Sequence, residues 1–183
     1  MALSATLYKA HLTVNNFDTN EFGTYELTVA RHPSETEARL MLRLIAFANY
    51  AHDRLEFTRG LCVSEEPELW QKDDTGHPQR WIELGLPEFK RLKQRSSKAT
   101  QLVVFAYGDQ NAQNWREQNQ SSWAKLDNLS VTYIETADLQ SAAQRCQRRM
   151  ELHVSIQDGL FELTAFGDTQ SGEPINIRLE KWK

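Results

Sequence analysis

Apolar and polar residues alternate near both ends of this 183-residue chain. From Leu7 the run ATLYKAHLTVNNFD alternates, and so does TYELTVARH after the turn-like DTNEFG, which predicts an antiparallel strand pair. RMELHVSIQ and LFELTAFGD alternate on either side of a turn containing Asp-Gly, a strong hairpin signal. PINIRLEKW predicts one more strand. We therefore expect antiparallel hairpins from both termini, packed together.

Between these hairpins, the spacing of apolar residues predicts a helix that starts at Ser34. Ser34 is a suitable N-cap, and Glu37 stands three residues later, as in a capping box. Apolar residues then recur at helical spacing from Leu40 to Ala48, and further apolar residues widen the stripe. We expect a central, mostly buried helix.

The middle of the chain alternates strands and helices. A strand is predicted near 55–61, followed by two strands joined at DDTGHP, where Asp, Gly and Pro supply turn geometry. Pro87 opens a short basic helix, and QLVVFAYG is typical of a strand buried on both faces. A helix, a strand and a helix follow in DQNAQNWREQNQ, NLSVTYIE and TADLQSAAQRCQRR. The pattern predicts a mixed α+β fold, a central sheet covered by helices, with residues 1–183 forming a single domain.

Composition is typical of a soluble globular protein, with 40% hydrophobic and 25% charged residues. No run approaches the roughly 18 to 20 apolar residues that a bilayer crossing needs. The N-terminus also lacks the basic and apolar segments of a secretory signal, so we expect a cytoplasmic protein with no membrane partner. Cys62 and Cys146 match no metal or redox motif, and we expect both to be reduced packing residues.

Charge is unevenly distributed along the chain. The net charge of -4 argues against a generic nucleic-acid coat protein, but KRLKQRSSK holds five basic residues and no acid. Such a run is more often a solvated helix face than a phosphate site. At about 100° per residue, Lys93 lies near Phe89 and Leu92 and is expected to lean toward the sheet. The other basic residues of the helix are expected to point further away: Lys90, Arg91 and Arg95.

Three glutamates surround the hairpin that turns at residues 73–78. If its strands pair, Glu68 and Glu83 meet at one end of the sheet, and paired carboxylates are the usual ligands of Mg²⁺ in phosphate chemistry. Glu66 and Glu68 could instead be a solvated loop, and Glu83 could lie with Trp81 on a wet face of its strand. Two helical turns after Pro87, Lys93 would return to the sheet end at Glu83.

Glu35 and Glu37 open the long helix. A helix N-terminus favours acidic residues, so structure alone can explain both of them. Glu37 has the stronger structural explanation through the capping box, although Glu35 can pair with Arg39 at spacing i,i+4.

Several motifs together resemble the YaeQ family over most of the chain. They are RHPSET leading into RLMLRLIAFA, then FTRGLC, EEPELW, WIELGLP, QNQ and NLSV. The resemblance implies a fold similar to the PD-(D/E)XK nuclease-like superfamily, with an αβββαβ core whose central mixed sheet is flanked by helices.

The resemblance also implies a metal site. Pro67-Glu68 looks like the superfamily's Pro-Asp element, Glu83 like the acid of its Asp/Glu-x-Lys element, and Glu35 like its helix glutamate. Gly85 stands where the lysine belongs, so Lys93, or else Lys90, would have to replace it.

Two functional hypotheses follow from this resemblance. In the first, Glu35, Glu68 and Glu83 bind Mg²⁺, Lys93 steadies the attacking water or the phosphate, and the protein cleaves nucleic acid. Arg91 and Arg95 would then help to hold the substrate backbone, and Glu66 is an alternative ligand to Glu68. In the second, the chain is a catalytically inactive nuclease-fold module that binds a protein or a nucleic acid.

Overall fold

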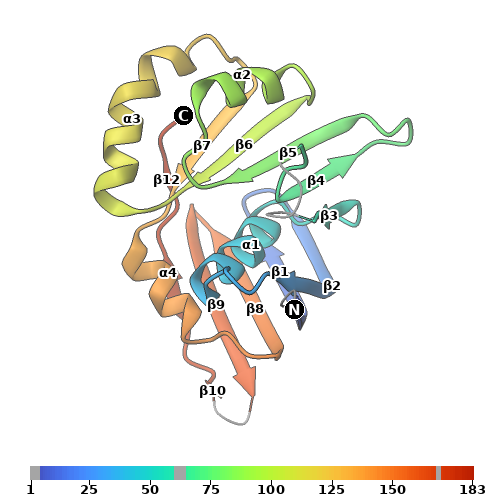
Figure 1. The fold of residues 1–183 in the computed structure, drawn as a ribbon. Helices are drawn as coiled ribbons and strands as arrows, with labels where there is room; N and C mark the ends of the chain where they lie inside the picture. The colour runs from blue at the N-terminus through green and yellow to red at the C-terminus, as the bar shows by residue number, and fades with distance from the viewer. Residues whose placement is uncertain (1–4, 60–64, 168–169) are drawn as a thin grey trace. The chain divides into compact units, whose positions relative to one another are not determined.

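A computed structural model describes residues 5–59, 65–167 and 170–183. Cys62 and the last part of the strand predicted near 55–61 lie outside the described residues. The described residues within Met1–Asp53 and Ala137–Leu179 form one compact unit, and those within Arg54–Thr136 and Glu180–Lys183 form another. Each unit contains one mixed sheet, so the predicted α+β class is confirmed (Figure 1). That the whole chain is a single domain stays a prediction.

The first unit contains the two terminal hairpins. Strand β1 (Thr6–Asn16) pairs antiparallel with β2 (Glu21–Arg31), and β8 (Arg149–Gln157) pairs antiparallel with β9 (Leu160–Gly167). β1 and β8 lie side by side in parallel, with Leu12 opposite Leu152. The expectation that the terminal hairpins pack together is therefore confirmed. The short strands β10 (Gln170–Ser171) and β11 (Ile175–Ile177) both pair with β9.

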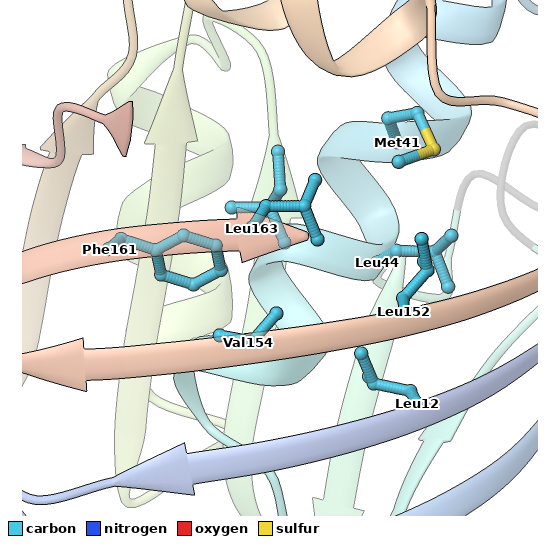
Figure 2. Close-up of a pocket in the computed structure, with 8 residues that line it drawn as sticks. Leu12, Met41, Leu44, Leu152, Val154, Phe161 and Leu163 are labelled. Atoms are coloured by element: carbon cyan, nitrogen blue, oxygen red, sulfur yellow. The ribbon is translucent and has the colours of Figure 1, made fainter. Parts of the chain in front are cut away.

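Helix α1 (Glu37–Asn49) packs on one face of this sheet. Alternate residues of β1 are buried, among them Leu12 and Val14, as the period of two predicts. Figure 2 shows apolar side chains of β1, β8 and β9 facing Met41 and Leu44 of α1. The seam leaves no space for a water molecule, so it is packed core and not a ligand site.

The start of α1 differs from the prediction. Thr36 is the N-cap, because its side chain accepts a hydrogen bond from the Arg39 N–H at 3.2 Å. The Ser34 hydroxyl is instead 2.6 Å from Nδ1 of His32, within a turn in which the Glu35 N–H donates to the His32 carbonyl. The predicted Ser34 cap is wrong, because this local turn competes for the hydroxyl. Glu37 is the first helical residue and no part of a capping box.

The second unit has the sheet order β12-β7-β6-β5-β4-β3. Strands β3 (Leu55–Phe57), β4 (Leu69–Lys72) and β5 (Pro78–Leu84) pair antiparallel in chain order. β6 (Gln101–Ala106) then pairs parallel with β5, and β7 (Leu129–Tyr133) pairs parallel with β6. The C-terminal strand β12 (Glu180–Lys181) pairs with β7. The predicted hairpin around residues 73–78 is thereby confirmed.

Two helices connect the parallel strands of this unit. α2 (Phe89–Ser96) joins β5 to β6, and α3 (Asp109–Trp123) joins β6 to β7; α4 (Thr136–Ala143) follows β7. Leu92 of α2 and Trp115 of α3 share one apolar core with Trp81 of β5 and with alternate residues of β6 and β7. Both helices therefore pack on the same face of the sheet (Figure 1). Of the helices in the described part of the chain, none has both the length and the apolar character needed to cross a membrane.

Candidate functional site

Glu83 lies near the end of β5 and is buried. Its neighbour in the sheet is Val104 of β6, in which residues 102–106 are all buried. Trp81, on the same face of β5, donates a hydrogen bond from Nε1 to Oε1 of Glu83 at 2.9 Å. The expectation that Glu83 could sit on a wet face is therefore wrong, and its charge must be compensated within the protein.

The compensating charges come from α2. Nη2 of Arg91 donates to Oε2 of Glu83 at 2.9 Å, and Nε of Arg95 lies 3.8 Å from Oε1. The Arg95 guanidinium also lies 5.0 Å from the centre of the Trp81 ring and forms an ion pair with Glu65 at 3.4 Å. Both carboxylate oxygens of Glu83 are thus engaged by donors of this chain.

The predicted orientation of α2 is wrong for Arg91, Lys93 and Arg95, whereas Lys90 is exposed as predicted. Lys93 is exposed, whereas Arg95 is buried and Arg91 contacts Glu83. The buried face of the helix is centred between Leu92 and Arg95, because stacking on Trp81 and the charge of Glu83 hold Arg95 inward. Lys93 lies about 130° from that centre at about 100° per residue, so it does not lean toward the sheet.

Gly85 occupies the position of the expected motif lysine, and its backbone explains the exchange. Its φ is +99°, in the left-handed region that residues with a side chain rarely adopt. Its N–H donates to the Phe105 carbonyl at 2.9 Å, which fixes the chain as it leaves β5. An added Cβ would meet only Tyr107 Cε1, at 3.9 Å, so the backbone angle and not crowding disfavours lysine here.

The two glutamates at the start of β4 lie in different surroundings. The Glu68 N–H donates to the Ile82 carbonyl at 2.9 Å, which places its backbone beside the end of β5 as the predicted hairpin requires. Glu68 is buried. Glu66 forms an ion pair with Arg59 at 2.6 Å, and the hydrogen bonds from Arg59 lower the pKa of the Glu66 carboxyl. Glu66 is therefore held by an arginine that stands seven residues before it in the chain.

Glu35 belongs to the first unit and is almost fully buried. Its Oε1 accepts a hydrogen bond from Nη1 of Arg39 at 2.7 Å, which confirms the predicted i,i+4 pair. Its Oε2 accepts from Nη1 of Arg43 at 3.3 Å, and the same nitrogen donates to the Ala30 carbonyl of β2 at 2.9 Å. The carboxylate is thus enclosed by two arginines from successive turns of α1.

These surroundings do not fit a magnesium ligand set. Mg²⁺ requires carboxylate oxygens that are available for coordination in a near-octahedral arrangement. The oxygens of Glu35 and Glu83 are instead engaged by guanidinium and indole donors. Across residues 5–59, 65–167 and 170–183, no three His, Cys, Asp or Glu side chains are grouped so that they could hold a metal ion.

Sequence reasoning missed Arg43, although its spacing was a usable signal. Glu35, Arg39 and Arg43 are spaced by four residues, which places the two arginines on one face of a helix. For Glu83, the alternation placed Trp81 on its face, but no spacing rule places Arg91 against a strand. That contact depends on how α2 packs on the sheet.

The exposed positive charges of α2 are its lysines. Lys90, Lys93 and Lys98 are all exposed, and within the described ranges none of them forms an ion pair. We name these three residues the α2 lysines. They are the groups of the predicted basic run that remain available to an anionic partner.

Comparisons with known sequences give one family. A family model described as YaeQ protein matches residues 1–172. The chain is 46% identical to the YaeQ protein of Escherichia coli (strain K12) over 177 residues, 97% of this chain and 96% of that one. It is 43% identical to the YaeQ protein of Salmonella typhi over 183 residues, 100% of this chain and 98% of that one. The names of these relatives state no activity.

Two solved structures are similar throughout. The crystal structure of the YaeQ protein from Xanthomonas axonopodis pv. citri is 34% identical, with a TM-score of 0.93 over 98% of this chain and 99% of that chain. The YaeQ protein from Pseudomonas syringae is 28% identical, with a TM-score of 0.90 over 98% and 96% of the two chains.

Proposed function

This chain belongs to the YaeQ family, and from that premise we propose that it is a catalytically inactive nuclease-like module that binds nucleic acid. The engagement of both Glu83 oxygens by Trp81 and Arg91 carries the proposal. A carboxylate held in this way supports the sheet and helix around it, and it offers no free oxygen to a metal ion.

The order of the elements supports the nuclease-like part of the proposal. α1, β3, β4, β5, α2 and β6 follow one another as in an αβββαβ core. Glu68 and Glu83 stand at adjoining ends of β4 and β5, where that superfamily has its acidic residues.

The positions of the basic residues support the proposed absence of catalysis. Cleaving a phosphodiester requires preorganised positive charge at the developing transition state. Lysine is disfavoured at Gly85 by its φ, and Lys93 is exposed. Arg91 and Arg95 already form ion pairs with Glu83.

Binding of nucleic acid is supported by the α2 lysines. Three exposed lysines on and just after one short helix can each contact a phosphate without reading sequence. Each such contact releases counterions, so three contacts predict a slope of about -2 to -3 for the logarithm of the binding constant against the logarithm of salt concentration.

A cleavage assay tests the first part of the proposal. The pure protein is incubated with Mg²⁺ or Mn²⁺ and a panel of single- and double-stranded DNA and RNA, beside Glu83→Ala. We expect no cleavage by either protein. Metal-dependent cleavage that Glu83→Ala abolishes would instead establish the enzymatic alternative.

Fluorescence anisotropy with the same nucleic acids tests the second part. We expect binding that weakens with salt and that falls by about tenfold or more when Lys90, Lys93 and Lys98 are all changed to glutamine. The matched control is Lys9→Gln/Lys125→Gln/Lys181→Gln, which removes three exposed lysines outside α2. Equal loss in both variants, or no binding by the wild type, would refute the role of the α2 lysines.

A further inference from the structure

Two hairpin turns are joined at one end of the sheet in the first unit. The carboxylate of Asp18, in the β1–β2 turn, accepts hydrogen bonds from the N–H groups of Asp158 and Gly159 in the β8–β9 turn, at 2.8 and 2.9 Å. The Phe17 N–H donates to the Ile156 carbonyl at 2.8 Å. Oδ1 of Asn16 accepts from the N–H groups of Asp18 and Thr19, at 3.1 and 3.2 Å. The two turns therefore form one rigid end of the sheet.

Three large apolar side chains are exposed at this end. Phe17, Phe22 and Leu160 are 51%, 54% and 67% exposed, and we name them the tip patch. The register places the patch at the ends of the strands that carry the two turns, because Phe22 lies opposite Asn15 of β1 and Leu160 lies opposite Gln157 of β8. The rings of Phe17 and Phe22 meet edge to face, with their centres 5.3 Å apart.

The tip patch lies on the sheet face turned away from α1. Residues that alternate with it, such as Val14 and Phe161, are buried on the α1 side. A fixed group of exposed large apolar side chains is a common mark of an interaction surface. Because the bridged turns and the aromatic pair already hold it in place, binding would cost little conformational entropy.

Acidic residues lie beside the tip patch. Segments 15–22 and 155–162 contain no lysine, arginine or histidine, and three of their carboxylates belong to the two turns or to the outer face of β9: Asp18, Asp158 and Glu162. The fourth, Glu21, lies opposite the buried Asn16 and so faces α1. On the β9 side, Arg178 follows β11 and leaves the carboxylates in excess. This charge repels nucleic acid, anionic lipid and the same patch on a second copy of the chain, and it favours a cationic partner.

We propose that the tip patch docks a segment of a partner protein that combines basic and apolar side chains. The apolar residues of that segment cover Phe17, Phe22 and Leu160, and its lysines or arginines lie against the acidic rim. The inference rests on the first unit alone and does not depend on the proposed function of the α2 lysines.

Peptide binding by the full chain tests the proposal. The probe is a fluorescent peptide of alternating leucine and lysine pairs, with a counterpart in which glutamate replaces lysine, and binding is followed by anisotropy. We expect the basic peptide to bind, to weaken with salt, and to lose about tenfold or more in affinity in Phe17→Ser/Phe22→Ser. Asp158→Asn/Glu162→Gln is expected to weaken it by a smaller factor and to reduce the salt dependence.

Leu7→Ser is the matched control, because Leu7 is 57% exposed at the other end of β1. It should bind the basic peptide as the wild type does. Circular dichroism and urea unfolding of each variant establish that it is folded.

Four results would overturn the proposal. They are no binding of the basic peptide, equal binding of the acidic peptide, unchanged affinity in the folded Phe17→Ser/Phe22→Ser variant, and a dimer in sedimentation that this variant dissociates. The last result would assign the tip patch to self-association.

Discussion

Glu35 and Glu83 are both buried glutamates paired with two arginines, yet their pairings differ in origin. The partners of Glu35 come from α1, the helix that begins just after it, four and eight residues along the chain. The partners of Glu83 come from a separate helix, eight and twelve residues after Glu83 in the chain. One pairing is local, and the other depends on how α2 packs against β5.

The two pairings also differ in how far their arginine side chains are shielded from solvent. The Arg43 side chain is 4% exposed and that of Arg39 is 13% exposed, so the Glu35 cluster is sealed on both sides. At Glu83, Arg95 is 5% exposed but Arg91 is 39% exposed, so one side opens to solvent. The buried Glu35 cluster is closed to ligands and therefore has a structural role. At Glu83, a ligand would have to approach from the side of Arg91.

The largest expected effect is at the sealed cluster. Arg43→Ala removes a buried partner of Glu35 and the hydrogen bond to the Ala30 carbonyl, so the free energy of unfolding should fall by about 3 to 5 kcal/mol. Urea denaturation measures the change. Arg54→Ala, which breaks an exposed pair with Asp74, is the control and should cost less than about 1 kcal/mol. Equal effects of the two changes would mean that the Glu35 cluster is not sealed.

The two arginines of Glu83 should differ from each other. Arg95→Ala should lower the free energy of unfolding by about 2 to 3 kcal/mol, because it removes a buried charge that stacks on Trp81. Arg91→Ala should cost only about 1 kcal/mol, because solvent can replace the half-exposed guanidinium. The same urea titration gives both values, and the reverse order would contradict the described closure of the site.

Restoring the missing motif lysine should not restore a site. Gly85→Lys places a side chain at a φ of +99°, and it should lower the free energy of unfolding by about 1 to 2 kcal/mol. Gly85→Ala is the matched control, and an equal loss there identifies the backbone as the cause. Metal-dependent cleavage by Gly85→Lys, absent from the wild type, would show that only the lysine was lacking.

The smallest expected effect is in the turn of the β4–β5 hairpin that carries Glu83. The Asp73 carboxylate accepts hydrogen bonds from Thr75, His77 and Gln79, with the Thr75 side chain as the largest cause, and these lower its pKa to about 2. Folding lowers the pKa of Asp73 below its ordinary value of 3.8, so the ionised carboxylate stabilises the folded state. This stabilisation is fully present above pH 3.8 and is lost as the pH falls toward 2. Asp73→Asn should therefore make stability less dependent on pH in that acid range, as acid titrations followed by circular dichroism can measure. The same dependence of stability on acid pH in Asp73→Asn and in the wild type would contradict this prediction.

Most of the fold followed from periodicity. The alternation of β1, β2, β8 and β9 and the helical stripe of α1 reflect burial on one side, which sequence records directly. The start of α1 did not follow, because Ser34 has a local partner in His32 that pattern reasoning ignored. Competition between nearby hydrogen bonds is not visible in an apolar pattern.

The candidate site was predicted only in part. Sequence identified Glu35, Glu68 and Glu83 as unusual, and all three are buried. It could not show that arginines would contact the carboxylate of Glu83, because the buried face of α2 was predicted from Phe89 and Leu92 alone. Arg95 turns inward through its ring contact and its ion pair, which are tertiary interactions. Hydrophobic spacing therefore misplaced the one buried cation of the helix.

Thermal unfolding of the wild type and Glu83→Gln, each with and without millimolar Mg²⁺, tests most directly whether Glu83 is a structural ion-pair partner. A glutamate paired with Arg91 and Arg95 stabilises the fold, so Glu83→Gln should lower the melting temperature, and Mg²⁺ should leave both proteins unchanged. A metal-binding carboxylate predicts the opposite pattern. Mg²⁺ would then raise the melting temperature of the wild type but not of Glu83→Gln, and the metal-free variant would be at least as stable as the wild type.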